Sequence, residues 1–71
     1  PGAFANRLLN GENALRVYRD FRGLTQAALA KTAGVNRVTV AEIETGRKQG
    51  SVATLRALAD ALGVSLDDLA D

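Results

Sequence analysis

The chain has 71 residues, and none of them is cysteine or histidine. A chain of this length folds as one domain around a single hydrophobic core. The composition excludes a disulfide framework and the usual zinc-site ligand patterns. It also offers no convincing nucleophile–base set and no paired-carboxylate motif. We therefore expect neither an enzyme nor a protein that carries a metal ion or another cofactor.

Charged side chains are unevenly distributed along the chain, although the formal net charge is only +1. Residues 1–48 carry eight basic and four acidic side chains, whereas residues 49–71 carry one basic and four acidic side chains. This asymmetry is typical of a module that binds a polyanion through one face, but it fits an ordinary solvated surface equally well. No apolar run reaches the roughly 18–20 residues of a membrane span, and no signal peptide is visible.

Ala, Leu and Val dominate the 46% of residues that are hydrophobic, and the β-branched residues do not alternate with polar ones. This pattern predicts an all-α fold. In the N-terminal segment, residues 1–12, one face of a short extra helix is suggested by Phe4, Leu8 and Leu9. The main domain, residues 13–71, is expected to be a compact unit of five helices joined by short loops.

The first of the five helices is expected from Asn13, a suitable N-cap, to Arg22, and Gly23 suits the left-handed conformation that ends a helix. Its apolar stripe consists of Leu15, Tyr18 and Phe21, supported by Val17. The second helix begins after the N-cap Thr25 and stops at Gly34. The third is expected over residues 36–44, with Asn36 as N-cap and Gly46 as its stop.

The fourth helix is predicted from Ser51 to Leu62, and Gly63 ends it. The fifth is one short turn opened by Ser65, where Asp68 completes an acidic variant of the capping box. Leu66 and Leu69 either close the core or belong to a dimer surface around Val64; core closure is the favoured interpretation. Between the second and third helices, the glycine turn gives the geometry of a helix-turn-helix, whose second helix enters the major groove of DNA.

The segments around this turn resemble the phage-repressor family of helix-turn-helix domains (Cro/repressor-like, Xre-type). The resemblance covers about residues 13–70, and it is carried by Arg22-Gly23-Leu24-Thr25-Gln26, Leu29-Ala30, Ala33-Gly34-Val35, Ile43-Glu44, Gly46-Arg47, Leu55, Leu58-Ala59, Ala61-Leu62-Gly63-Val64-Ser65-Leu66 and Leu69. It implies a five-helix domain whose third helix reads double-stranded DNA as a homodimer, in a cytoplasmic, nucleoid-associated transcriptional regulator.

Periodicity independently gives a candidate reading surface, because Val40 and Ile43 set the core-facing side of the third helix. The side chains left to meet base edges are Arg37, Val38, Ala41 and Glu42. Arg37 can donate to guanine O6 and N7 or to a phosphate. Val38 and Ala41 suit the methyl group of thymine. Glu42 reads cytosine N4, or pairs with Arg37 or Arg47, or weakens DNA binding by repelling phosphates.

Phosphate contacts are expected at the ends of the second and third helices. The resemblance implies that Gln26, in the first turn of the second helix, grips a phosphate, and the dipole of that turn also favours an anion. The further candidates are Asn36, Thr39, Thr45, Arg47 and Lys48. Asn36 is equally explained as a helix cap. The loop after residue 46 lacks the proline of many relatives, so we expect it to be flexible.

The resemblance also implies a largely buried ion pair between Arg19 and Glu44, which would orient the reading helix. A second interpretation of the whole chain is an antitoxin or adaptor whose main partner is a toxin or another protein. The two interpretations are compatible, because antitoxins of this kind repress their own operons. Expected partners are thus duplex DNA, a second copy of the chain and a protein, but not a membrane.

Overall fold

The computed structural model describes residues 2–70, so Pro1 and Asp71, the outer ends of the two expected segments, lie outside it. The helices in this part of the chain are α1 (Gly2–Leu9), α2 (Ala14–Phe21), α3 (Gln26–Ala33), α4 (Arg37–Glu44), α5 (Val52–Leu62) and α6 (Leu66–Leu69). The predicted all-α fold is confirmed, with α2–α6 as the five expected helices and α1 in the N-terminal segment. None of the helices within residues 2–70 is long and apolar enough to cross a membrane.

Helices α2 to α6 begin at the side chains that the sequence predicts as caps. At α3, the Thr25 hydroxyl accepts a hydrogen bond from the Ala28 backbone N–H at 3.0 Å. Each such oxygen satisfies one of the backbone donors that a helix start leaves without a partner. Ser65 and Asp68 form the reciprocal capping box of α6, each accepting from the other's backbone N–H. Local polar residues therefore fix where the helices start.

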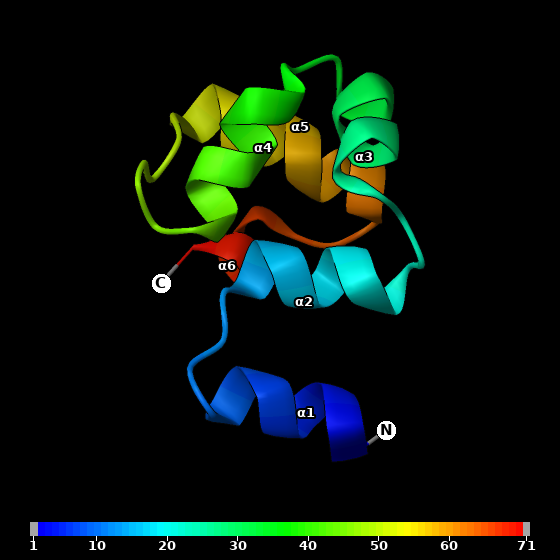
Figure 1. Cartoon of the computed structure of the whole chain (residues 1–71), viewed down its shortest axis with the longest axis vertical. Helices are drawn as coiled ribbons and strands as arrows, with labels where there is room; N and C mark the ends of the chain where they lie inside the picture. Colours follow the sequence, from blue (N-terminus) through cyan, green and yellow to red (C-terminus); the bar gives the residue numbers. More distant parts are fainter. Residues whose placement is uncertain (1, 71) are drawn as a thin grey trace.

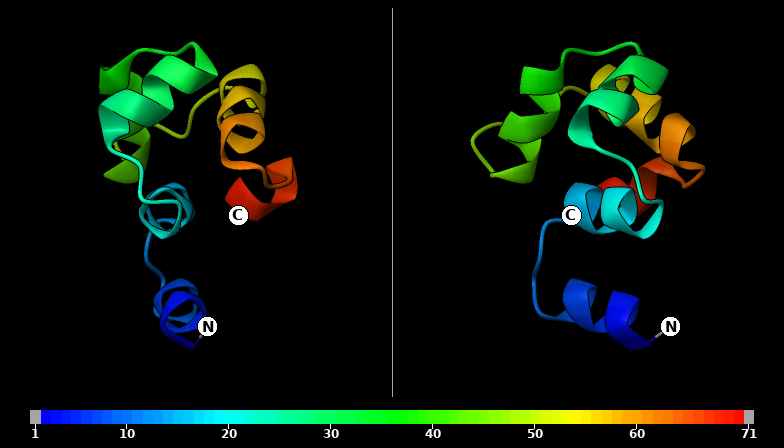
Figure 2. Two further views of the ribbon diagram at one scale, coloured as in Figure 1. Left: turned by 90° about the vertical axis from the view of Figure 1, so that its right-hand side faces the viewer. Right: turned by 45° about the vertical axis from the view of Figure 1, so that its right-hand side comes forward.

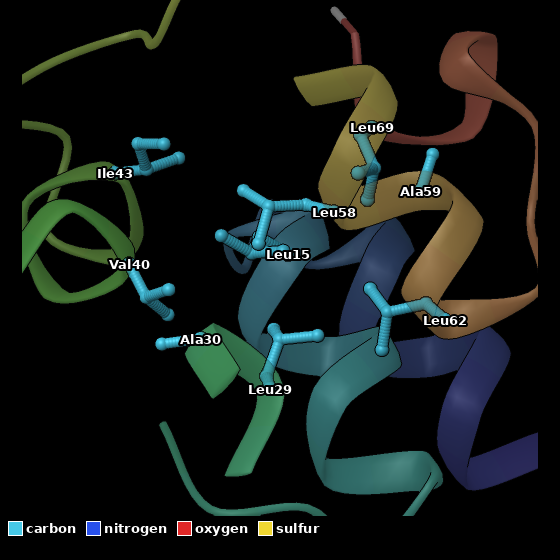
Figure 3. Packing of buried hydrophobic residues seen from close by; sticks show 9 residues of the cluster. All are labelled: Leu15, Leu29, Ala30, Val40, Ile43, Leu58, Ala59, Leu62 and Leu69. Carbon is cyan, nitrogen blue, oxygen red and sulfur yellow. The ribbon is translucent and has the colours of Figure 1, made fainter. Parts of the chain in front are cut away.

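The core lies between α2, α3, α4, α5 and α6, and its side chains point toward one another (Figure 3). Its nine buried members are Leu15, Leu29, Ala30, Val40, Ile43, Leu58, Ala59, Leu62 and Leu69. Leu69 thus closes the core, as the favoured interpretation predicts, whereas Leu66 is only half-buried. Between α3 and α4, Gly34 has φ of 72°, a conformation that a side chain would resist. This turn lets both helices pack on the same core.

Helix α1 runs antiparallel to α2 and lies on the side of α2 that faces away from the other helices (Figure 1). The Phe4 ring meets Tyr18 edge to face, with centroids 5.1 Å apart, and Phe21 at 4.8 Å. Arg7 adds ion pairs at 2.9 Å to Glu12 and Asp20. Helix α1 is therefore held by an aromatic cluster and by one arginine between two carboxylates.

The expected single apolar stripe of α2 is wrong in two places. Val17 is fully buried but lies outside the core cluster, beside Phe4 and Phe21 on the α1 side. Phe21 remains 54% exposed and packs on Phe4, not into the core. The reason is that α2 carries two apolar faces, one for the core and one for α1. The apolar pattern of a single helix does not show how many neighbouring helices pack against it.

Candidate nucleic-acid interface

Helix α4 presents a narrow strip of side chains on its outer side. This reading strip consists of Arg37, Val38, Ala41 and Glu42. Val40 is fully buried and Ile43 is nearly so, which turns the opposite side of the helix to solvent. The apolar Val38 side chain is 51% exposed there. A shallow hollow on this side is lined by Arg37, Val38, Ala41, Glu42, Thr45 and Arg47. All four side chains predicted to face DNA bases therefore line one surface, together with two of the predicted phosphate contacts.

The C-terminal end of α4 is anchored by Asn13, a residue expected only to cap α2. Its Oδ1 accepts from the Arg16 backbone N–H at 3.0 Å, so the cap is present. Its Nδ2 donates to the Ile43 carbonyl at 2.9 Å, linking the start of α2 to the last turn of α4. The residue type was the only local signal for this second bond, because asparagine adds a donor to the capping oxygen.

A second anchor is the ion pair between Arg19 of α2 and Glu44 of α4. Arg19 donates through Nε to Glu44 Oε2 at 2.6 Å and through Nη2 to Oε1 at 2.9 Å. The two side chains are 12% and 4% exposed, respectively. The hydrogen bonds to Glu44 raise the pKa of the Arg19 guanidinium, against the smaller opposing effect of burial. A bidentate pair of this kind fixes orientation as well as distance.

Gln26 lies between this ion pair and the reading strip. Its Nε2 donates to Glu44 Oε1 at 3.1 Å, and its Oε1 accepts from Arg37 Nη1 at 3.3 Å. The primary amide has a second N–H, which leaves a donor for a phosphate. Sequence reasoning named Gln26, Glu44 and Arg37 separately but did not connect them. The connection depends on how the start of α3 packs beside α4, which local patterns do not specify.

Glu42 pairs with Lys48, which is neither of the two arginines considered from the sequence. Its Oε1 lies 3.6 Å from Lys48 Nζ, and the Lys48 backbone N–H donates to the Glu42 carbonyl at 3.2 Å. The chain bends back after α4 and brings Lys48 against it, whereas Arg47 lies in the hollow. The Glu42 charge is thereby partly balanced beside the reading strip.

The remaining predicted phosphate contacts are spread over both ends of α4. Asn36 caps the helix by accepting from the Val38 backbone N–H at 2.8 Å and is exposed. Thr45 donates its hydroxyl to the Glu42 carbonyl at 3.2 Å. Thr39 is half-buried and does not line the hollow. The candidate interface therefore consists of the outer strip of α4, the start of α3 and the first part of the loop that follows α4 (Figure 2).

The loop between α4 and α5 depends on Gly50, whose importance sequence reasoning missed. Its φ is 79°, and a Cβ placed on it would lie 2.8 Å from Ile43 Cδ1. The loop backbone thus packs directly on the Ile43 side chain, whose terminal methyl would have to shift if residue 50 carried a Cβ. Gly50 was visible only as one glycine among seven.

Two short helices joined by the Gly34 turn, with the second exposing a strip of base-compatible side chains, define a helix-turn-helix domain. The helix-turn-helix domain family matches residues 13–71, so the chain belongs to this family. A relative from Bacillus subtilis, the uncharacterized HTH-type transcriptional regulator YazB, is 38% identical over 56 residues, which are 79% of this chain and 81% of the relative. Another, the uncharacterized HTH-type transcriptional regulator y4dJ of Sinorhizobium fredii, is 41% identical over 59 residues, 83% of this chain and 75% of the relative. No solved structure gave a significant match.

Proposed function

We propose that this protein is a transcriptional regulator that binds double-stranded DNA sequence-specifically, with α4 in the major groove. The observation that carries this proposal is the exposed strip on α4, whose rear is held to α2 by Asn13 and by the Arg19–Glu44 pair. A helix held in this way can present base-reading side chains in a fixed orientation. The relatives named as HTH-type transcriptional regulators support the same conclusion.

The four side chains of the strip are suited to different base contacts. Arg37 donates to guanine or to a phosphate, and the exposed Val38 and neighbouring Ala41 contact thymine methyl groups. Glu42 accepts from cytosine N4 once the major groove displaces its contact to the exposed Lys48. The strip is therefore suited to a mixed sequence and not to a run of one base pair.

Phosphate contacts from both ends of the reading helix place it in the groove. Gln26 retains one N–H for this purpose, and Arg47 and Lys48 supply positive charge beside the hollow. Asn36 keeps its amide N–H donors for a phosphate, because its cap uses the oxygen alone. Thr45 and Thr39 are weaker candidates, because the Thr45 hydroxyl already donates to backbone and Thr39 is half-buried. Such contacts fix register without reading sequence.

A domain of this size contacts few base pairs, so we propose a two-fold dimer on an inverted repeat. Its half-sites would lie about 34 Å apart, one turn of the double helix. Bound across a promoter, such a dimer blocks access of RNA polymerase, which makes repression the expected mode of action.

Selection from a random duplex library, at a fixed and stated salt concentration, tests this proposal. We expect enrichment of an inverted repeat, and the enriched duplex should bind much more weakly as salt rises, because each neutralised phosphate releases counterions. Arg37→Ala should abolish enrichment at one position of each half-site. Failure to enrich any duplex, or binding that is insensitive to salt, contradicts the proposal.

A second function, as an antitoxin or adaptor that binds a protein partner, is favoured by α1. This helix lies outside the part of the chain that the family matches. It carries Leu9, which is 83% exposed, and it lies beside the half-exposed Phe21. Both functions can coexist, because the α1 side of the molecule is separate from the reading strip (Figure 1).

A further inference from the structure

The carboxylate of Glu44 has a second partner besides Arg19. Its Oε1 accepts from Arg19 Nη2 at 2.9 Å and from Gln26 Nε2 at 3.1 Å. The Glu44 side chain is only 4% exposed, and Arg19 holds both of its oxygens. The carboxylate is therefore a fixed acceptor at the start of α3.

This fixed acceptor dictates which way the Gln26 amide points. An ionised carboxylate can only accept hydrogen bonds, so the amide nitrogen must face Glu44. The amide oxygen then faces the opposite way, toward α4. There it accepts from Arg37 Nη1 at 3.3 Å, and a guanidinium can only donate. Both contacts of Gln26 thus agree with one orientation of its amide and disagree with the flipped one.

The contact to Gln26 also selects one edge of the Arg37 guanidinium. With Nη1 engaged, the free planar edge consists of Nε and Nη2. Two parallel N–H donors on such an edge match the O6 and N7 acceptors of guanine in the major groove. The engaged arginine has also lost rotamer freedom before DNA arrives, which lowers the entropic cost of the base contact.

We propose that Glu44, acting through Gln26, is a positioning residue that presents the Nε–Nη2 edge of Arg37 to a guanine. This inference rests on the proposed function as a DNA reader, and it names the base read at one position of the site. The Arg19–Glu44 ion pair consequently has two tasks. It joins α2 to α4, and it orients Arg37, a base-reading side chain on the outer side of α4.

A simple phosphate contact by Gln26 would give different results from positioning. Loss of a phosphate contact weakens binding to all sequences alike and lowers the salt dependence. Loss of positioning relaxes discrimination at the one base pair that Arg37 reads. Discrimination at that pair, measured at fixed salt, therefore separates the two roles of Gln26.

The experiment uses the duplex selected by the full chain and versions with one base pair replaced. Arg37→Ala first identifies the pair that Arg37 reads, which we expect to be G·C with the guanine toward α4. The wild type should prefer it over the other pairs by about 5- to 150-fold, the range of a bidentate arginine–guanine contact. Gln26→Leu should reduce this preference at least threefold, whereas the control Arg47→Ala should weaken binding equally for all four pairs.

A measurement on the DNA-free protein gives a second, independent readout. In nitrogen-15 relaxation spectra, the Nε–H of Arg37 should be nearly as ordered as that of Arg19. Gln26→Leu should make Arg37 mobile while leaving Arg19 ordered, because the Arg19–Glu44 bonds do not pass through Gln26. Glu44→Gln should mobilise both arginines, and thermal unfolding shows whether each variant is folded.

Several results would overturn the proposal. One is a pair other than G·C under Arg37, and another is an unchanged preference in Gln26→Leu accompanied by uniformly weaker binding. An Arg37 side chain as mobile in the wild type as in Gln26→Leu would also contradict it. If the wild type binds all duplexes alike, it is the proposed function that fails, and the relaxation measurement still decides whether Glu44 and Gln26 order Arg37.

Discussion

Asn13 and Ile43 are joined by a hydrogen bond of 2.9 Å from the side-chain amide of the first to the backbone carbonyl of the second. The bond closes a long loop of chain and ties the start of α2 to the end of the reading helix. Because the Asn13 oxygen also caps α2, one side chain sets the beginning of one helix and the position of another. The orientation of α4 therefore depends on a residue far from it in sequence.

Asn13→Asp separates the two bonds of this side chain. Aspartate keeps the capping oxygen but loses the donor and places a carboxylate beside the Ile43 carbonyl. The Ile43 carbonyl still accepts from the Gly46 backbone N–H at 3.1 Å, but it would then face a carboxylate with no donor between the two oxygens. We expect the free energy of unfolding to fall by about 1–3 kcal/mol, the cost of a lost hydrogen bond and of two acceptors in contact. Urea denaturation measures this change. Asn36→Asp is the matched control, because Asn36 acts through its oxygen alone, and its unfolding free energy should change by less than about 0.5 kcal/mol.

Glu44→Ala removes the bidentate partner of Arg19 and leaves this largely buried charge with only the partly exposed Asp20, at 3.4 Å. We expect a loss of about 3–5 kcal/mol in the free energy of unfolding. The control is Glu42→Ala, because Glu42 pairs with an exposed lysine, and its loss should be under about 1 kcal/mol. Circular dichroism during urea denaturation provides both values. Equal losses for the two variants would show that the Arg19–Glu44 pair is not buried in solution.

Gly50→Ala should be more damaging than Gly11→Ala, although both glycines have nearly the same φ, 79° and 80°. At Gly11 a Cβ would meet nothing within 4 Å, so the loss is backbone strain alone, about 1 kcal/mol. At Gly50 it would press on the Ile43 side chain, adding about 1 kcal/mol or more. Thermal unfolding of both variants tests the difference. If it is absent, the loop does not pack against Ile43.

Tyr18 predicts a loss of stability in alkaline solution. Burial of its ring, with a smaller contribution from the negative charge of Asp68, raises the pKa of Tyr18 above 10.0 in the folded protein. A pKa raised by folding stabilises the protein while the phenol is neutral in both states. That contribution falls as the pH rises through 10 and beyond, because the unfolded chain ionises first.

Phenolate absorbance measures this pKa directly, since Tyr18 is the only tyrosine of the chain. The titration midpoint should be higher in buffer than in concentrated urea. Tyr18→Phe should lessen the fall of unfolding free energy above pH 10. Coincident midpoints in the folded and unfolded protein would refute the prediction.

Much of the fold was predictable from single residues. The starts at Asn13, Thr25, Asn36, Ser51 and Ser65 were all predicted, because a cap acts on backbone groups two or three positions away. The effect of a glycine that ends a helix is equally local, because it depends on the backbone conformation of that residue. The inner side of α4 followed from Val40 and Ile43, and this was sufficient to place Arg37, Val38, Ala41 and Glu42 on one surface.

The contacts between helices were not predictable in the same way. The place of Gln26 between Glu44 and Arg37 requires the start of α3 to lie beside both ends of α4. Lys48, and neither Arg37 nor Arg47, pairs with Glu42 because the loop after α4 folds back on it. Val17 faces α1. This contact was not predictable from α2 alone, because the covering helix belongs to the N-terminal segment, outside the main domain. Each of these facts depends on tertiary packing, which patterns within one helix do not encode.

The two apolar faces of α2 have a consequence for how such domains vary. Val17 is fully buried only while α1 covers it, and Phe4 shields part of Phe21. A family member without a helix before α2 would expose both positions to water. We therefore expect the residues aligned with Val17 and Phe21 to change together with the N-terminal segment, apolar where that helix is present and polar where it is missing. The pair would then serve as a signature, readable from sequence, of which members carry the additional helix.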